Sequence, residues 1–169
     1  MDTRWRRFNT ILPLMLMVLL GVGCKTTEKK VASLLRMHLE TNPDGTDRTA
    51  TVAIGRNKAF SVTIEKEWFL DEGHIQHATV VDDVGGFQIS LQFDKRGTLL
   101  LEQYTVAHKG SRVAIYGVFG KERWLAAPLI VRGISDGKFL FTPDATREEA
   151  DRLVLGLNKV GNKLDESRN

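Results

Sequence analysis

Apolar and polar residues alternate along several short stretches of this chain, and this two-residue period most constrains its fold. The clearest stretch is 87–93, where Phe87, Ile89, Leu91 and Phe93 alternate with polar residues. The stretches 35–39, 50–54 and 60–64 show the same alternation. Because successive side chains of a strand point to opposite faces, each stretch predicts a strand with one buried face. The pattern therefore predicts a sheet that is mainly antiparallel.

Turn-forming residues join the first three of these stretches. Asn42-Pro43-Asp44-Gly45 follows the first stretch, and Gly55-Arg56-Asn57 follows the second. Short turns connect antiparallel neighbours, so we expect consecutive strands to pair. We assign residues 31–59 to an N-terminal β meander that is continuous with the domain at 60–160.

Two segments change to a helical period. The first is 97–108, and Gly110 follows it. The second begins at the capping-box sequence of Thr146 and Glu149 and carries an apolar stripe. That stripe consists of Ala150, Leu153, Val154, Leu157 and Val160. We predict an α+β fold, with a mainly antiparallel sheet and two principal helices packed on one face.

Residues 1–23 have the features of a secretory signal peptide. Three arginines at positions 4, 6 and 7 precede a mostly apolar run at 11–22, and small residues precede Cys24. Cys24 is the only cysteine and resembles the lipidated cysteine of bacterial lipoproteins. The alternatives are a plain signal peptide and a membrane-spanning helix. A helix over 11–22 would span about 18 Å of a hydrocarbon core about 30 Å thick.

The lipoprotein resemblance implies a diacylglycerol on the Cys24 sulfur and attachment to a membrane outside the cytoplasm. Residues 24–30 are then a polar tether. Lys25 follows the cysteine where the inner-membrane retention signal has Asp, which favours the outer membrane. Lys and Arg number 24 and Asp and Glu 21, and three of the arginines lie in the leader. The remaining chain is close to neutral, so we expect no nucleic-acid partner.

Five motifs follow one another in the second half of the chain. They are FQISLQFDKRG at 87–97, GSRVAI at 110–115, APLI at 127–130, ISDG at 134–137 and TREEA at 146–150. Their order resembles that of the head subdomain in the first periplasmic domain of SecD, from the SecDF protein-export family. The resemblance covers 60–160 and implies the SecD-head fold and contact with preprotein. We expect a polar tail at 161–169.

Catalytic motifs are missing from the sequence. It has no G-x-S-x-G and no glycine-rich phosphate loop before a helix, so we expect no enzyme and no cofactor. The remote alternative is a metal-dependent hydrolase that uses His74, His77 and Asp82. Two histidines without a third placed ligand are a poor metal site, so we expect no metal. His38 and His108 have no partner motif and are expected at the surface.

Aromatic residues near loops are the best candidates for partner binding: Trp68, Phe69 and Trp124. Alternatively, they cover the open end of the sheet. The favoured function is a lipid-anchored, non-enzymatic binding module that assists export by engaging extended polypeptide. Strand addition at an exposed sheet edge would provide the contact, and the segment 124–131, which contains Pro128, is one candidate edge. The alternative is a structural or assembly lipoprotein that docks on an envelope or translocase complex.

Overall fold

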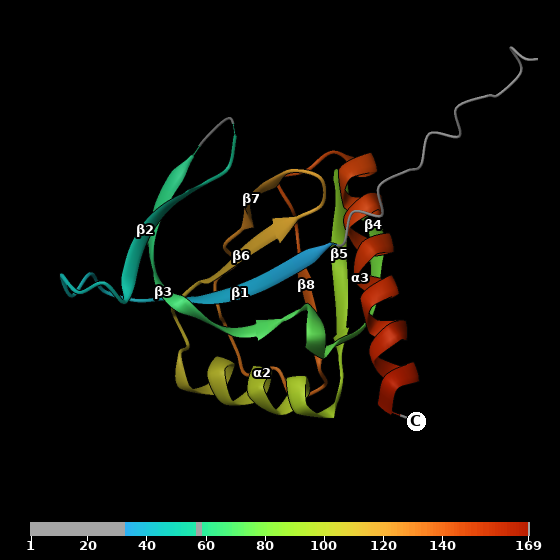
Figure 1. Cartoon of the computed structure of the whole chain (residues 1–169). Helices are drawn as coiled ribbons and strands as arrows, with labels where there is room; N and C mark the ends of the chain where they lie inside the picture. The colour runs from blue at the N-terminus through green and yellow to red at the C-terminus, as the bar shows by residue number, and fades with distance from the viewer. Residues whose placement is uncertain (1–32, 57–58, 169) are drawn as a thin grey trace, which may run out of the picture. The chain divides into compact units, whose positions relative to one another are not determined.

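The computed structural model describes residues 33–56 and 59–168, and their side chains as far as 163. The predicted leader, Cys24 and tether lie outside the described residues. The elements are β1 (Leu34–Glu40), β2 (Thr49–Ile54), β3 (Phe60–Asp71), the 3-10 turn η1 (Glu72–His74), β4 (Ile75–Asp83), β5 (Gly86–Phe93), α2 (Lys95–Ala107), β6 (Val113–Val118), β7 (Glu122–Ala126), β8 (Lys138–Phe141) and α3 (Arg147–Arg168) (Figure 1).

Five strands form the larger sheet, in the order β2-β3-β1-β6-β7. The predicted meander is wrong in its pairing, because β3 lies between β1 and β2. β3 has 12 residues. Its first half pairs with β2, from Ile54 opposite Phe60, and its second half pairs with β1, up to Arg36 opposite Asp71. A strand of this length can pair with two neighbouring strands, one along each half. The short turns in the sequence indicated only pairing between strands that are consecutive in the chain.

The smaller sheet has three strands in the order β4-β5-β8, all antiparallel. The predicted β4–β5 hairpin is confirmed, and Gly85 occupies its turn with a φ of 86°. β6 is a central strand, as its apolar sequence predicted, and β7 ends the larger sheet.

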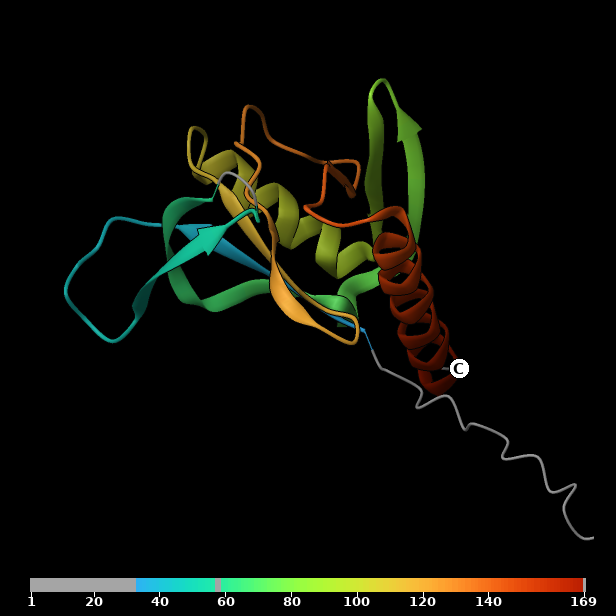
Figure 2. The ribbon, with the colours of Figure 1, turned by 90° about the horizontal axis from the view of Figure 1, so that it is seen from above.

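Both predicted helices are present, and the α+β fold class is confirmed. The sequence led us to expect one sheet with both helices on one face; instead α2 packs chiefly on β3 and α3 on β4. The capping box is confirmed, since the Glu149 carboxylate accepts the Thr146 N–H at 2.9 Å. α3 also continues through most of the predicted tail, where residues 162–168 contain no helix breaker. Figure 2 shows the C-terminal end of α3 on the opposite side of the domain from the loop at 41–48.

The main core lies between the two sheets and the two helices. The alternation predicted for β1 is confirmed, because Leu35, Met37 and Leu39 are all buried in this core. A second, smaller cluster lies on the other face of the larger sheet. It consists of Ile54, Val62, Ile64, Ala114 and Ala127. The end strands β2 and β7 contact each other, so the sheet curls around this cluster. Neither helix within 33–56 and 59–168 is long and apolar enough to cross a membrane.

Candidate functional site

A strand edge can bind a polypeptide only if its backbone groups are free, and the edges of the two sheets differ in this respect. At the β4 edge, the side chain of Asn158 in α3 forms hydrogen bonds with the backbone of Ala78. Its Oδ1 accepts the Ala78 N–H at 2.7 Å, and its Nδ2 donates to the Ala78 carbonyl at 2.9 Å. The amide therefore makes the pair of hydrogen bonds that a neighbouring strand would make.

α3 also approaches the start of β4 closely. A side-chain carbon added at Gly161 would lie 2.9 Å from the Ile75 carbonyl oxygen and 3.2 Å from that of Gln76. Only glycine allows a helix to pack at this distance from a strand backbone. The first part of the β4 edge, from Ile75 to Ala78, is therefore blocked by α3.

The β7 edge, which lies in the predicted strand-addition segment 124–131, is also occupied. The Leu125 carbonyl accepts the N–H of Asp144 at 2.7 Å, and the Ala127 carbonyl accepts Nη1 of Arg112 at 2.9 Å. β2, the other end of this sheet, faces β7 across the curl. Within the candidate segment 124–131, the carbonyls of Leu125 and Ala127 are therefore taken by residues distant in sequence, and residues 128–131 remain as a candidate edge.

Within the part of the chain that the structure describes, the β8 edge is open at Leu140. The Phe93 N–H donates to the Gly137 carbonyl at 2.9 Å, which fixes the phase of the antiparallel ladder. Because hydrogen-bonded pairs alternate along such a ladder, Phe139 and Phe141 share their backbone bonds with β5. The N–H and carbonyl of Leu140 then point away from β5. Leu140 is also 49% exposed.

A groove of about 230 Å³ runs beside this edge. Its second wall is the segment 128–132. It is lined by Pro128, Leu129, Ile130, Val131, Arg132, Ile134, Lys138, Phe139 and Leu140. Most of these residues are apolar, and Leu129 and Val131 are 48% and 74% exposed. Large apolar side chains gathered at a surface groove are typical of binding sites.

The second wall also has backbone groups that no residue in the described ranges pairs with. The Pro128 carbonyl accepts the Val113 N–H at 3.0 Å, and Ile130 bonds to Ser111 and Gly110 at 2.8 and 2.9 Å. Since alternate residues of an extended segment point to opposite sides, the backbone groups of Leu129 and Val131 point away from these partners. The groove therefore has apolar walls, and on both sides it has backbone donors and acceptors that pair with no described residue.

Two of the three aromatic residues predicted to bind a partner lie on one face of the larger sheet, around His38. The His38 ring contacts Trp68 and Trp124 edge-on, with centroids 6.3 and 5.2 Å apart. Trp124 packs on the second apolar cluster, whereas Trp68 is 40% exposed and carries the Arg36 guanidinium 3.8 Å from its ring centroid. Trp124 thus covers the curled sheet, while Trp68 and Arg36 form a surface.

Phe69 is separate from this pair. Its ring stacks on Tyr104 of α2, with centroids 4.5 Å apart. Phe69 therefore packs β3 against α2, and the structure gives it a role inside the domain.

His38 was predicted at the surface, and that prediction is wrong. It is only 6% exposed, and its Nδ1 lies 2.9 Å from the Glu65 carbonyl oxygen. Burial lowers the pKa of His38, and the nearby Arg36 lowers it further, against the opposing effect of the Glu65 contact. The sequence held a signal for this position, since the buried alternation of β1 puts residues 36, 38 and 40 on the second face. His108 is half-buried and stacks on Tyr104.

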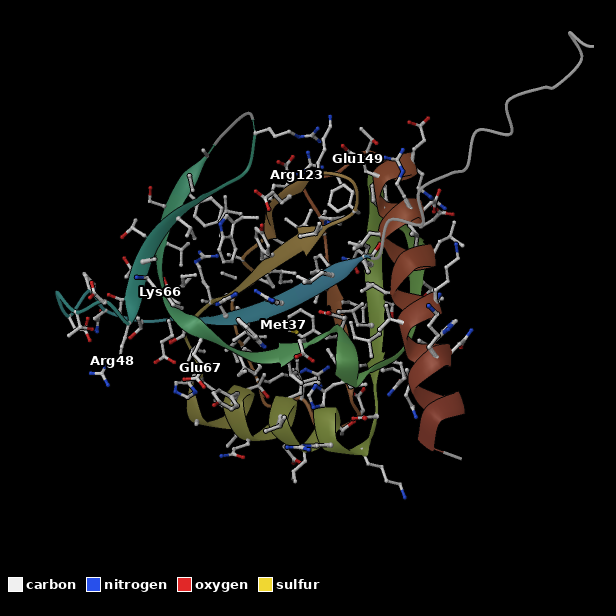
Figure 3. The ribbon with its side chains drawn as sticks, in the orientation of Figure 1. Met37, Arg48, Lys66, Glu67, Arg123 and Glu149 are labelled. Carbon is white, nitrogen blue, oxygen red and sulfur yellow. The ribbon has the colours of Figure 1, made fainter. Side chains whose placement is uncertain are left out.

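Ion pairs join the start of α3 to β7 and to the β2–β3 hairpin. Arg123 donates to the Glu149 carboxylate at 2.6 Å, and Figure 3 shows these two side chains pointing toward each other. Arg56 donates to Asp144 at 3.2 Å and lies 3.9 Å from Glu149. The hydrogen bond from Thr146 and the bond from Arg123 lower the pKa of Glu149. This network holds the curled sheet against α3.

The histidines considered for a metal site do not converge. His74 bonds to Asp71 at 3.0 Å, His77 is exposed, and Asp82 forms an ion pair with Arg147. Within the described ranges, no three His, Cys, Asp or Glu side chains form a group that could hold a metal ion.

The comparisons with known proteins agree on one family. The family model of the SecDF P1 head subdomain matches residues 48–160, about two thirds of the chain. This match includes β2, although the motifs in the sequence had indicated only 60–160. Two solved structures align over 76% of this chain at 20% identity.

The first of these is described as a membrane component, SecDF, that enhances protein export, and it aligns over 63% of its own length with a TM-score of 0.56. The second is SecDF in a super-membrane-facing form, aligned over 19% of its length with a TM-score of 0.55. The chain therefore spans only part of each, and identity at this level shows the fold alone. A search of curated proteins found no significant match.

Proposed function

Because the chain belongs to the SecDF P1 head subdomain family, we propose that it is a non-enzymatic, protein-export-related module that binds extended polypeptide along the β8 edge. The observation that carries this proposal is the groove, whose two walls offer apolar side chains beside backbone groups that are unpaired within residues 33–56 and 59–168. Backbone pairing tolerates varied sequences, which suits a protein that must bind many exported chains.

Contacts at other sheet edges support this choice of site. Asn158 bonds to the backbone of Ala78 on the β4 edge, and Asp144 and Arg112 bond to the carbonyls of Leu125 and Ala127 beside the β7 edge. Proteins protect exposed strand edges against unwanted pairing, so an edge left open beside an apolar groove is consistent with a role in binding.

A photo-crosslinking residue at position 140 tests the proposal. Leu155 provides the matched control, because it is also a leucine and is 61% exposed, but it lies on α3. We expect an unfolded, export-competent polypeptide to form adducts from position 140 and few from position 155. Equal yields from the two positions would show that contact at the groove is nonspecific and would contradict the proposal.

We further propose that Cys24 carries a lipid and holds the domain on the periplasmic side of a membrane. The sequence features before Cys24 support this, and the near-neutral domain offers no electrostatic alternative. Cys24→Ser should release the protein from the membrane fraction, and mass spectrometry of the parent should find the acyl chains. An unmodified Cys24 thiol in membrane-bound protein would contradict the lipid anchor.

A second candidate function is docking on an envelope complex through the surface formed by Trp68 and Arg36. It is favoured by the exposure of Trp68 and by the cation stacked on it, since such residues often anchor interfaces. Trp68→Ala should then lose a stoichiometric partner in a pull-down from membranes while polypeptide crosslinking at position 140 persists.

A further inference from the structure

The charged residues that line the groove are both cations. Arg132 lies on the wall formed by 128–132, Lys138 lies on the wall formed by β8, and both side chains are exposed. Within the described residues, neither forms an ion pair. Asp136, two residues before Lys138, accepts the backbone N–H of Lys138 at 3.0 Å. The two side-chain cations are therefore available to an acidic ligand.

The register of β8 relates Lys138 to Leu140. Phe139 and Phe141 are buried in the core, so the alternating side chains of Lys138 and Leu140 share the outward face. In a strand added at this edge, one residue lies opposite Leu140, and the residue two positions away lies opposite Lys138. Directly opposed side chains on one face of a sheet interact, and opposite charges there are favourable.

We propose that the groove selects extended segments in which an acidic side chain lies two positions from an apolar one. The apolar side chain packs on Leu140 and the exposed leucine and valine of the other wall, while the acidic one faces Lys138. Arg132 attracts the same carboxylate or a neighbouring one. This inference rests on the proposed function, because it names the class of polypeptide that the site prefers.

Binding of labelled peptides to the purified full chain tests the preference, with fluorescence anisotropy at low ionic strength. Three 12-residue peptides differ only around a central valine. One has Glu two positions away on each side, so that strand direction does not matter, one has Lys at those positions, and one has Glu immediately next to the valine. We expect the first peptide to bind about two- to fivefold more tightly than the third, and the second to bind most weakly.

Charge reversal at Lys138 provides the decisive variant. Lys138→Glu should invert the order of the Glu and Lys peptides, and Lys138→Gln should weaken the preference without inverting it. Lys121→Glu is the control, because Lys121 is exposed and lies outside the groove lining. It makes the same charge change and should leave the order intact. Circular dichroism of each variant confirms that the fold is retained.

The outcomes separate the inference from the function on which it rests. Failure of all three peptides to bind overturns the polypeptide-binding function and the preference together. Equal binding of the three peptides, or a preference that Lys138→Glu leaves unchanged, overturns the preference and leaves polypeptide binding in place.

Discussion

Replacement of Asn158 by Ala removes the side chain that pairs with the β4 edge at Ala78, and the cost in stability follows from the structure. Asn158 makes two hydrogen bonds, at 2.7 and 2.9 Å, to the backbone of Ala78, which is 1% exposed. Each bond contributes about 1 kcal/mol, and a buried donor or acceptor left unpaired costs about 1–3 kcal/mol. We expect Asn158→Ala to lower the free energy of unfolding by about 2–4 kcal/mol.

Asn162→Ala is the matched control, because it makes the same substitution in the same helix at an exposed position. Both changes gain the same helix propensity, so their difference isolates the contacts with Ala78. In urea unfolding followed by circular dichroism, a slope of about 2 kcal/mol per molar predicts a midpoint about 1–2 M lower for Asn158→Ala. Midpoints that agree within about 0.2 M would refute the view that Asn158 substitutes for a neighbouring strand.

Three other predictions concern the ion pairs, the buried histidine and the groove. Glu149→Gln should destabilise the fold by about 1–2 kcal/mol near pH 7, measured by urea unfolding, because it weakens the hydrogen bonds from Thr146 and Arg123. Glu149 has a lowered pKa, so this difference should vanish as the pH falls through that pKa. Burial lowers the pKa of His38, so the unfolded chain binds its proton more readily and stability should fall below about pH 6.5. His38→Gln should flatten that fall, and an unchanged pH profile would contradict the burial argument. Leu140→Asp should reduce polypeptide binding at least fivefold while Leu155→Asp does not, and equal loss in both would count against the groove.

Local periodicity predicted the elements well but not their partners. The alternation in β5 and the capping box at Thr146 are properties of adjacent residues, and both appear as expected. The order of β1, β2 and β3 depends on irregular pairing between residues far apart, with register shifts on both sides of His38. No local pattern contains that information, which is why a simple meander was expected.

The open and closed edges were also beyond local prediction. The groove forms where 128–132, which is not a regular strand, meets β8 from another sheet. Asn158 did leave a signal, because it lies four residues after Val154, on the buried stripe of α3. A polar residue inside such a stripe indicates a buried hydrogen-bonding partner, although the sequence cannot identify that partner as Ala78.

Hydrogen exchange at the amide of Leu140 tests the central claim most directly. This N–H points away from β5, so it should exchange rapidly in the free protein. When an extended peptide is bound, its exchange should slow markedly, together with that of Leu129 or Val131, because the added strand pairs with them. Peptide binding that leaves the Leu140 amide unprotected while it protects another edge would contradict the account.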